Sequence, residues 1–291
     1  MIKVRVPGSI SNFGSGFDSL GMAISFYNTF KFEKSEKFEI KSKYKVLDIE
    51  DHPTIKALKY LGEKYKVDVK SSVTIEGNIP PTRGLGSSAS CYIAGLIGGA
   101  HLSKLRINKS EIYEMATVLE GHPDNVAPAL FGGLQISAII ENIPINQKIE
   151  FCDQLKLYAF IPKEEVSTKL ARECLDKRIN LNDATYNISR IALLVNALNL
   201  KDYKFLKESF NDKLHQKYRI KLIPNGEEII SWVNNNCKYG GFISGAGSTI
   251  IGIHDKKDKG LLEKFYKDTN IDINKCSSYK IELDKAGAKL I

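Results

Sequence analysis

The stretch Pro80-Pro81-Thr82-Arg83-Gly84-Leu85-Gly86-Ser87-Ser88-Ala89-Ser90 decides how this chain folds. Gly84 and Gly86 have no Cβ, so the backbone can come close to a ligand there. The paired serines can cap the free N–H groups of a following helix. Such N–H groups and the positive end of the helix dipole attract anions, and Arg83 adds a positive charge. The segment therefore predicts a phosphate-binding loop that opens a helix.

An ordinary glycine-rich turn before a helix is the alternative interpretation. The apolar residues that follow recur at intervals of three and four, as in a buried helix: Tyr92, Ile93, Leu96, Ile97 and Ala100. The usual nucleotide-binding patterns are absent from the sequence, namely G-x-x-x-x-G-K-[ST], G-x-G-x-x-G between strand and helix, and the H-R-D and D-F-G of protein kinases. A nucleotide would therefore be bound by a different kind of loop.

The 291 residues suffice for one large domain or two smaller ones. With 43% hydrophobic and 26% charged residues, the composition is that of a globular protein and excludes disordered and fibrous classes. A net charge of +8 is compatible with a nucleic-acid partner, an anionic substrate or a lysine-rich surface. Because the lysines are scattered among acidic and apolar residues, we expect a solvated surface and no nucleic-acid partner.

The five cysteines are too far apart for a zinc site, and their odd number argues against a full disulfide framework. A reducing compartment is therefore expected. The N-terminal residues lack the apolar core of a signal peptide, and no apolar run is long enough to span a bilayer. We expect a cytoplasmic protein without a membrane partner.

The order of predicted elements is that of an α+β protein. Strands are expected at 2–6, 22–32, 37–46, 72–76, up to 140 after Gly132-Gly133, 155–161, 241–253 and 278–283. Helices are expected at 53–65, after the phosphate-binding loop, and at 109–119, 126–131, 167–176, 183–199, 202–210, 226–236 and 258–268. A boundary near residue 150 divides the chain into an N-terminal domain, 1–152, and a C-terminal domain, 153–291.

Three further segments concentrate glycine and short polar side chains. Pro7 to Asp18 leaves the first strand, and its Asn12 and Asp18 can hydrogen-bond an ammonium or hydroxyl group. Glu120-Gly121-His122-Pro123-Asp124-Asn125 combines acid, imidazole and amide, which fits either helix caps or a magnesium and hydroxyl-positioning site. Gly240 to Thr249 is a third glycine loop, which is either a turn between strands or a cover for a bound ligand.

Together these segments resemble the GHMP kinase superfamily, and within it the homoserine kinase family. That family carries a P-x-x-S-x-N-x-G-x-G-F-D start, here Pro7 to Asp18, and an E-G-H-P-D-N-V-A-P segment, here Glu120 to Pro128. Its S-T-x-x-A-R and Y-R-x-x-L-I-P stretches appear as Ser167 to Arg172 and Tyr218 to Pro224. Ile10 and Ser248 depart from the family pattern.

The resemblance implies a two-domain GHMP kinase fold, with a ribosomal-protein-like N-terminal domain and a ferredoxin-like C-terminal domain. It also implies ATP-dependent phosphorylation of L-homoserine to O-phospho-L-homoserine in threonine biosynthesis, by a homodimer. Pro80 to Ser90 would wrap the triphosphate, with Arg83 beside the γ-phosphate. Ser88 and Glu120 would hold Mg²⁺. The implied substrate-binding residues are Asn12, Asp18, His122, Asp124, Arg172 and Arg219, with Asn125 orienting the hydroxyl.

Two alternatives remain open at the level of sequence. The acceptor could instead be mevalonate, shikimate or a sugar, although two arginines favour a substrate with a carboxylate because guanidinium pairs with it through two parallel bonds. The ribosomal-protein-like topology and basic charge also allow a nucleic-acid-binding protein, for which the sequence lacks a clustered basic stripe. The sequence offers no confident Asp and Lys pair as a general base, so we expect attack without one.

Overall fold

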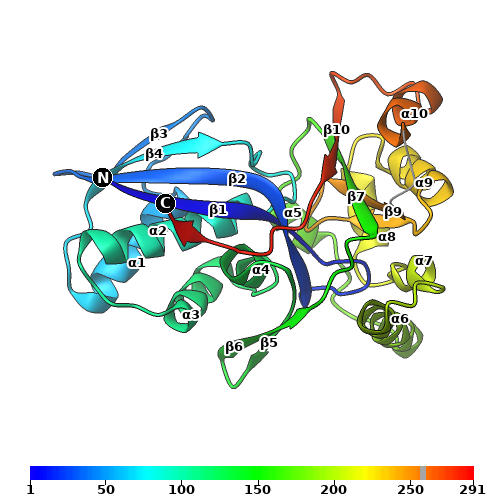
Figure 1. Ribbon diagram of the computed structural model, residues 1–291, viewed down its shortest axis with the longest axis horizontal. Coiled ribbons are helices and arrows are strands. Elements are labelled where there is room, and N and C mark those ends of the chain that lie inside the picture. The colour runs from blue at the N-terminus through cyan, green and yellow to red at the C-terminus, as the bar shows by residue number, and fades with distance from the viewer. Residues whose placement is uncertain (256–259) are drawn as a thin grey trace.

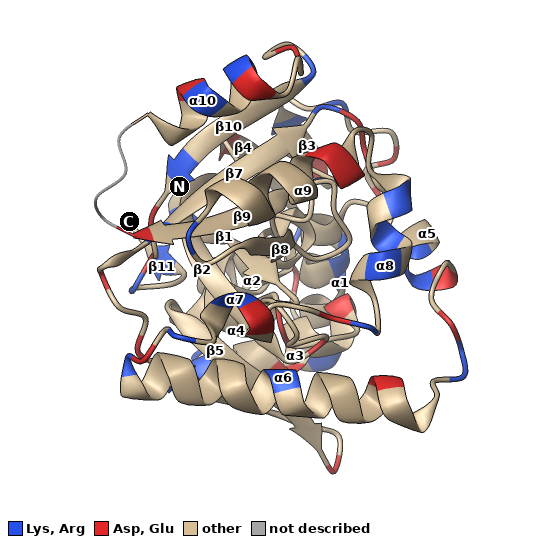
Figure 2. Ribbon diagram, turned by 90° about the vertical axis from the view of Figure 1, so that its right-hand side faces the viewer, with Lys and Arg blue, Asp and Glu red and all other residues tan. Residues whose placement is uncertain are grey.

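The computed structural model describes residues 1–255 and 260–291. Two sheets lie side by side, each covered by helices (Figure 1). The predicted α+β class is confirmed. In the part of the chain described, no helix combines the length and apolar character needed to cross a bilayer. Residues of both charge signs occur along α6 and α10 (Figure 2).

The first sheet has seven strands. They are β1 (Ile2–Ser11), β2 (Leu20–Lys34), β3 (Glu39–Ser42), β4 (Ser71–Gly77), β5 (Leu134–Ile140), β6 (Ile143–Ile149) and β11 (Lys289–Leu290). The order is β11-β1-β2-β4-β3, with β5 paired to β2 and β6. Because β11 pairs with β1, the C-terminus returns to the first sheet. The boundary after residue 152 stays a prediction.

Four helices pack on one face of this sheet: α1 (Pro53–Tyr65), α2 (Ser87–Leu102), α3 (Lys109–Glu120) and α4 (Val126–Phe131). Helix α2 lies at their centre, and its glycines permit close packing. A Cβ on Gly95 would meet Ala57 and the Thr54 carbonyl at 2.7 Å, and one on Gly98 would collide with Phe32. The buried helix places its N-terminus at the edge of the sheet, where β1 ends.

The second sheet has the order β10-β7-β9-β8, formed by β7 (Leu155–Pro162), β8 (Gly241–Ile243), β9 (Ile250–Asp255) and β10 (Cys276–Ile281). This antiparallel order is the ferredoxin-like one that the resemblance implies. Alternate residues of β7 face opposite sides: Leu157 and Ala159 join a core shared with the first sheet, whereas Phe160 joins a second core.

The remaining helices surround the second sheet. They are α5 (Thr168–Glu173), α6 (Leu181–Leu200), α7 (Leu206–Ser209), α8 (Gln216–Arg219), the short η1 (Ile220–Leu222), α9 (Gly226–Asn236) and α10 (Leu261–Asp268). Leu194 and Leu198 of α6 join the core shared by both sheets. Trp232 of α9 and Phe265 of α10 close the opposite face, with ring centroids 5.1 Å apart.

Several predicted elements need correction. The expected strand 241–253 is two strands, β8 and β9, because the glycine loop Ser244 to Thr249 turns the chain back on itself. The expected helix 202–210 is the single turn α7, and the strand expected at 37–46 is only Glu39–Ser42. The start expected at 258 for the last helix lies outside the described residues. Strand β6 was not predicted.

Candidate active site

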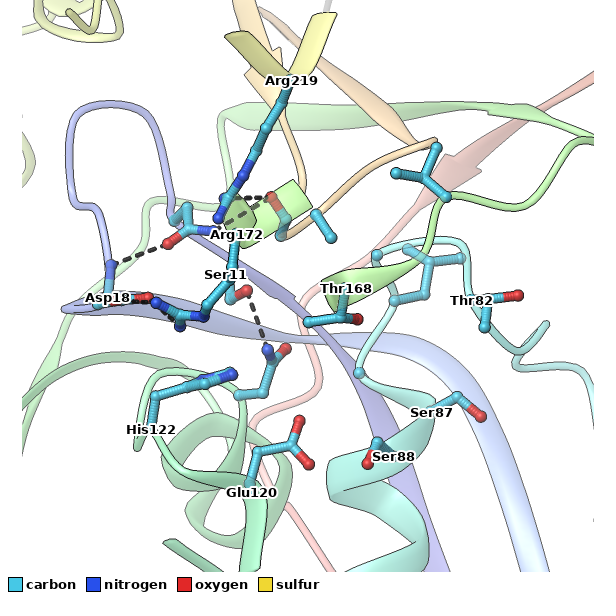
Figure 3. Close-up of a pocket in the computed structure, with 18 residues that line it drawn as sticks. Ser11, Asp18, Thr82, Ser87, Ser88, Glu120, His122, Thr168, Arg172 and Arg219 are labelled. Carbon is cyan, nitrogen blue, oxygen red and sulfur yellow. Dashed lines mark hydrogen bonds and ion pairs between the residues drawn. The ribbon is translucent and has the colours of Figure 1, made fainter. Parts of the chain in front are cut away.

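A cavity lies where the N-terminus of α2 meets the loops after β1 and α3 and the helices α5 and α8 (Figure 3). It is lined by Ser11, Asn12, Asp18, Thr82, Gly84, Leu85, Gly86, Ser87, Ser88, Glu120, His122, Asn125, Val166, Thr168, Arg172, Arg219, Gly245 and Ala246. Residues from all four glycine-rich or polar segments of the sequence therefore meet in one place.

The loop before α2 has the features of an anion site, although not in every detail that the sequence suggests. Gly84 and Gly86 have φ of +70° and +64°, which favour glycine. A Cβ at Gly84 would collide with the Ser244 carbonyl, and one at Gly86 with the Ser9 hydroxyl. The close neighbour that requires these glycines is thus the protein itself.

The N-cap of α2 is Gly86, and no side chain caps this end. The expectation that Ser87 and Ser88 cap the helix is therefore wrong, because they stand inside its first turn. Ser90 turns its hydroxyl inward and donates to the Ser87 carbonyl at 2.7 Å. Uncapped N–H groups at a helix N-terminus are the donors that bind phosphate.

The third glycine loop holds this anion site in place. The Thr249 hydroxyl donates to the Arg83 carbonyl at 2.6 Å, and the Ser244 hydroxyl donates to the Gly84 carbonyl. The Ser9 amide donates to the Leu85 carbonyl at 3.1 Å. The loop is thus fixed by β1 of the first sheet and by the loop between β8 and β9 of the second, and its shape does not depend on a ligand.

The Arg83 side chain points out of the cavity. Its Nε donates to the Pro162 carbonyl at 3.1 Å, and its Nη1 lies 3.4 Å from Glu165. Arg83 and Pro80 instead line a neighbouring cavity of about 410 Å³ that also contains Tyr44 and Asn78. Pro81, Ala89 and Ser90 do not line the first cavity either, so the part of the predicted loop that lines it is Thr82 and Gly84 to Ser88.

Two arginines form one wall of the cavity. Arg172 makes a two-pronged pair with Asp18: Nη1 to Oδ2 and Nη2 to Oδ1 are both 2.9 Å. Arg219 is only 2% exposed. Its Nε donates to the Ala171 carbonyl at 3.1 Å and its Nη1 to the Gly245 carbonyl at 2.8 Å. No ion pair within 4.0 Å joins Arg219 to a carboxylate of residues 1–255 or 260–291.

Burial lowers the pKa of Arg219, and the charge of Arg172 lowers it further, whereas the charge of Asp18 acts in the opposite direction. A buried guanidinium without a carboxylate is costly unless a ligand supplies one. The arrangement therefore favours an anionic group at this wall.

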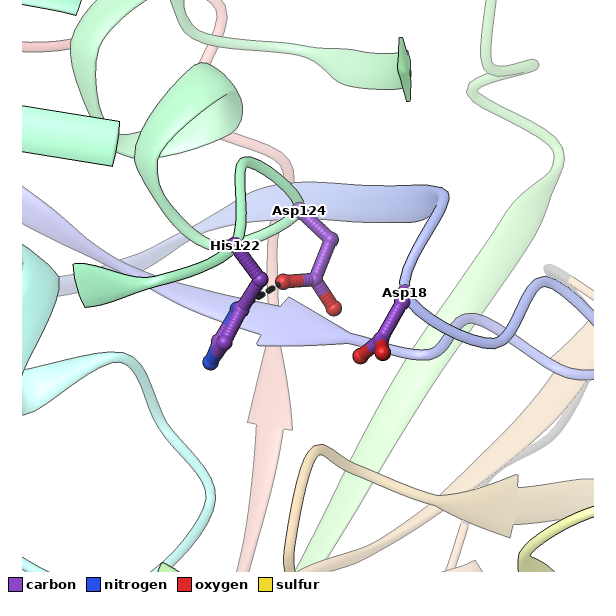
Figure 4. A group of neighbouring side chains, drawn as sticks. All are labelled: Asp18, His122 and Asp124. Atoms are coloured by element: carbon purple, nitrogen blue, oxygen red, sulfur yellow. Dashed lines mark hydrogen bonds and ion pairs between the residues drawn. The ribbon is translucent and has the colours of Figure 1, made fainter. Parts of the chain in front are cut away.

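Asp18, His122 and Asp124 form an acidic group next to the arginines (Figure 4). Asp18 and His122 line the cavity, whereas Asp124, which is 1% exposed, is not among the lining residues. The ligand atoms of all three lie within 4.8 Å of one another, so they could surround a cation. His122 Nδ1 lies 2.5 Å from Asp124 Oδ1. Burial opposes protonation of the imidazole, but this hydrogen bond and the charge of Asp124 raise the pKa of His122.

The other oxygen of Asp124, Oδ2, is buried and has no hydrogen-bond partner among the residues that the structure places. A buried carboxylate oxygen without a donor is costly, so a ligand that brings an N–H group would be stabilised there. Asn12 lines the cavity, but its side chain holds the backbone of Asp18 and of the third glycine loop in place. Its Oδ1 accepts the Asp18 amide at 2.8 Å, and its Nδ2 donates to the Gly245 carbonyl at 3.2 Å.

Asn125 lies between two serines of β1. Ser9 Oγ donates to Asn125 Oδ1 at 2.8 Å, and Asn125 Nδ2 donates to Ser11 Oγ at 3.0 Å. An amide nitrogen carries two hydrogens, so one N–H of Asn125 remains for a ligand. Ser11 and Thr168 were not among the predicted site residues, although both stand in the polar segments that the sequence marked.

Glu120 ends α3 and faces the cavity beside Ser88 (Figure 3). Burial raises the pKa of Glu120, while His122 and the Ser88 hydroxyl act in the opposite direction. A carboxylate and a hydroxyl next to an anion site are hard oxygen donors of the kind that Mg²⁺ binds together with phosphates. The residues therefore fit a magnesium ion.

The fold and the cavity define a class of protein that family models recognise. Residues 53–133 match the GHMP kinases N terminal domain, and residues 194–268 match the GHMP kinases C terminal domain. A crystal structure of homoserine kinase from Cytophaga hutchinsonii superposes with a TM-score of 0.84 at 24% identity, covering 100% of this chain and 97% of that one. The mevalonate kinase of Methanococcus jannaschii has a TM-score of 0.69 at 17% identity, over 97% and 98% of the two chains. The expected GHMP kinase fold is confirmed.

Sequence relatives narrow the assignment. The homoserine kinases of Clostridium botulinum and Clostridium beijerinckii are each 38% identical over 297 residues, which cover 100% of this chain and 99% of theirs. That of Aquifex aeolicus is 38% identical over 270 residues, 90% of each chain. The chain belongs to the homoserine kinase family of the GHMP kinases.

Proposed function

We propose that this protein transfers the γ-phosphate of ATP to the side-chain hydroxyl of L-homoserine and produces O-phospho-L-homoserine, a step of threonine biosynthesis. The relatives named homoserine kinase, 38% identical over the full chain, support this activity. The observation that carries the choice of substrate is the presence of both charges at one cavity. Among residues 1–255 and 260–291, buried Arg219 has no carboxylate within ion-pair distance, and Asp124 Oδ2, close to Asp18 and His122 of the cavity lining, has no donor.

The carboxylate of the substrate binds Arg219 and Arg172. Arg219 offers a guanidinium whose position is already fixed by two backbone carbonyls. A fixed planar fork loses little entropy when it binds a carboxylate. Arg172 comes from α5 and reaches the same wall from the side of Asp18.

The ammonium group binds Asp18 and the free oxygen of Asp124, on the acidic side of the cavity. Mevalonate, shikimate and galactose have no ammonium group and would leave Asp124 Oδ2 without a donor. His122 holds the other Asp124 oxygen, and Asn12 fixes the backbone of Asp18. The acidic group therefore discriminates between an amino acid and the other acceptors of the superfamily.

The triphosphate lies along Gly84 to Ser88, where the uncapped amides of α2 neutralise its charge. The neighbouring cavity, which contains Tyr44, Asn78, Pro80 and Arg83, is continuous with this loop and suits the nucleoside. Arg83 would then meet the nucleotide from that cavity. Ser88 and Glu120 hold Mg²⁺, which neutralises charge on the phosphates when bound.

The remaining N–H of Asn125 aims the hydroxyl of the substrate at the γ-phosphate. Phosphoryl transfer depends chiefly on positioning and charge neutralisation, so a strong general base is not required. We expect the proton to leave late, to phosphate or to solvent.

The test is a coupled ATP assay with the purified protein, Mg²⁺ and four acceptors offered separately: L-homoserine, mevalonate, shikimate and galactose. We expect turnover with L-homoserine and at least about 100-fold lower kcat/KM with the others, which is about 2.7 kcal/mol of discrimination. Equal or better turnover with any of the other three would contradict the choice of substrate.

We further propose that the protein is a cytoplasmic homodimer. Its five cysteines are all free, which suits a reducing compartment.

The dimer interface is proposed at the hairpin of β5 and β6. In the sheet as described, β6 pairs with β5 alone. The exposed face of this hairpin carries Ile140, Ile143 and Ile145, which are 43–55% exposed. An open edge beside an apolar face can pair with a second copy. Sedimentation of the wild type and of Ile143→Glu tests this: the substitution should yield monomers, and unchanged sedimentation would place the interface elsewhere.

A further inference from the structure

Phe17 lies among the charged residues of the substrate-binding wall, although it was not among the predicted site residues. The Cζ atom of Arg219 is 5.2 Å from the centre of its ring, and that of Arg172 is 5.9 Å away. These arginines belong to α8 and α5, whereas Phe17 belongs to the loop after β1. One aromatic ring therefore touches both guanidiniums from a third segment.

The other neighbour of the ring is His215, whose ring stacks on Phe17 with centroids 5.1 Å apart and planes 21° from parallel. His215 is fully buried. Burial lowers its pKa to about 4, so it is neutral near pH 7. Its Nδ1 lies 3.4 Å from Arg219 Nη1. The ring of Phe17 is thus supported by a neutral, immobile partner.

The ring of Phe17 can stabilise the two guanidiniums, which carry like charges in one pocket. Burial lowers the pKa of Arg219 most, the charge of Arg172 lowers it further, and the charge of Asp18 raises it. Asp18 forms a direct ion pair with Arg172, whereas it stabilises the charge of Arg219 only from beyond ion-pair distance. An aromatic ring attracts a cation, more strongly when both are shielded from water.

We propose that Phe17 is a positioning residue for the substrate carboxylate, because its ring holds Arg172 and Arg219 at the spacing that receives that group. The inference rests on the proposed function, since it takes the two arginines as the carboxylate site. If Phe17 only filled space, a leucine would replace it at no cost to substrate binding.

The experiment compares Phe17→Leu, Phe17→Met and Phe17→Tyr in the full-length protein. Leucine and methionine keep an apolar side chain but remove the ring, and tyrosine keeps the ring. We expect the KM for L-homoserine to rise about tenfold in the first two variants, with kcat and the KM for ATP within about twofold of wild type, as loss of two cation–π contacts predicts. Phe17→Tyr should restore the KM.

A second readout separates arginine positioning from general damage. The compound 3-amino-1-propanol is homoserine without its carboxylate, so its inhibition constant as a competitor of L-homoserine should not depend on the arginines. We expect this constant to be unchanged in Phe17→Leu while the KM for L-homoserine rises. The matched control is Phe205→Leu, which removes an exposed ring next to Lys204 that does not line the cavity; its kinetics should equal those of wild type.

An unchanged KM for L-homoserine in Phe17→Leu, or a parallel loss of affinity for 3-amino-1-propanol, would overturn the role of Phe17 while leaving the proposed function intact. If Phe17→Leu lowers the midpoint of thermal unfolding so far that it cannot be assayed, Phe17→Met gives the same comparison. A wild-type protein that neither binds nor phosphorylates L-homoserine would overturn both proposals.

Discussion

Arg172 and Asp18 are 154 residues apart in the sequence and form a two-pronged ion pair across the cavity, with both N–O distances at 2.9 Å. The pair joins the loop after β1 to α5, and so links the two halves of the molecule at the substrate site. The proposed substrate also carries one positive and one negative charge. Its ammonium is complementary to Asp18, and its carboxylate is complementary to Arg172. Binding therefore exchanges one internal pair for two pairs with the ligand.

Asp18→Asn should raise the KM for L-homoserine about 100-fold, because removing one partner of a close charge pair costs about 2–5 kcal/mol. The KM for ATP should stay within about twofold, since Asp18 faces the amino acid. Steady-state kinetics with each substrate varied in turn measure both. The matched control is Asp153→Asn, an exposed partner of Lys285 at 3.4 Å. Equal effects on both KM values would count against the assignment.

Arg219→Lys should also raise the KM for L-homoserine, by about tenfold or more, because an ammonium cannot reproduce the planar fork that binds a carboxylate. The buried position of Arg219 makes its loss more costly than that of Arg172, which is 41% exposed as a side chain. Comparing Arg219→Lys with Arg172→Lys tests this order, and a larger effect at Arg172 would contradict it.

Asn125→Ala should lower kcat by about 100-fold, as expected for loss of a donor that acts at the reacting group. The Kd for ATP should not change, and the loss should be the same across the accessible pH range because an amide does not titrate. Isothermal calorimetry with ATP and a pH series of kcat provide the two measurements. Unchanged turnover would refute the role of Asn125.

Glu120→Gln should raise the Mg²⁺ concentration that gives half-maximal turnover by about tenfold or more, because the substitution removes a charged oxygen next to the phosphates. The measurement is a magnesium titration at fixed ATP. Glu111→Gln is the control: this residue caps the other end of α3 through a hydrogen bond to the Asn108 amide. A titration curve identical to wild type for Glu120→Gln would remove Glu120 from the metal site.

The stability of the fold should decrease between pH 6.5 and about 4 because of His215. Burial lowers the pKa of His215 from 6.5 to about 4. Below pH 6.5 the unfolded chain binds a proton that the folded chain does not, so the free energy of unfolding falls until the folded His215 also titrates. The loss approaches about 3 kcal/mol by pH 4.

Urea denaturation of the wild type and of His215→Asn over this pH range isolates the contribution of the imidazole. The pKa of Asp212 is lowered as well, so its contribution disappears only as the pH falls below the ordinary range of a carboxylate. The variant should therefore lose less stability than wild type between pH 6.5 and 4. Parallel curves for the two proteins would contradict this account.

Local signals made much of the fold and site predictable. Gly84 and Gly86, which mark the loop in the sequence, adopt positive φ, and Asn12 and Asp18 are also left-handed, with φ of 53° and 52°. Asn and Asp tolerate this conformation better than other side chains. The periodic apolar residues of α1 and α2 likewise predicted these two helices correctly.

Contacts between distant segments set the features that could not be predicted. The side chain of Arg83 turns away from the cavity because carbonyls of residues 162 and 163, at and after the end of β7, accept its N–H groups. Nothing near Arg83 in the sequence indicates this. Phe17 lies beside Arg172 and Arg219 only because α5 and α8 fold over the first loop.

The most direct test of the central claim is a crystal structure with a non-hydrolysable ATP analogue, Mg²⁺ and L-homoserine. The account predicts phosphate oxygens on the amides of Gly86 to Ser88, the carboxylate of the amino acid on Arg172 and Arg219, and its hydroxyl beside Asn125, in line with the terminal phosphate. A complex with the phosphates elsewhere, or with the amino acid reversed so that its carboxylate faces Asp18 and Asp124, would contradict it.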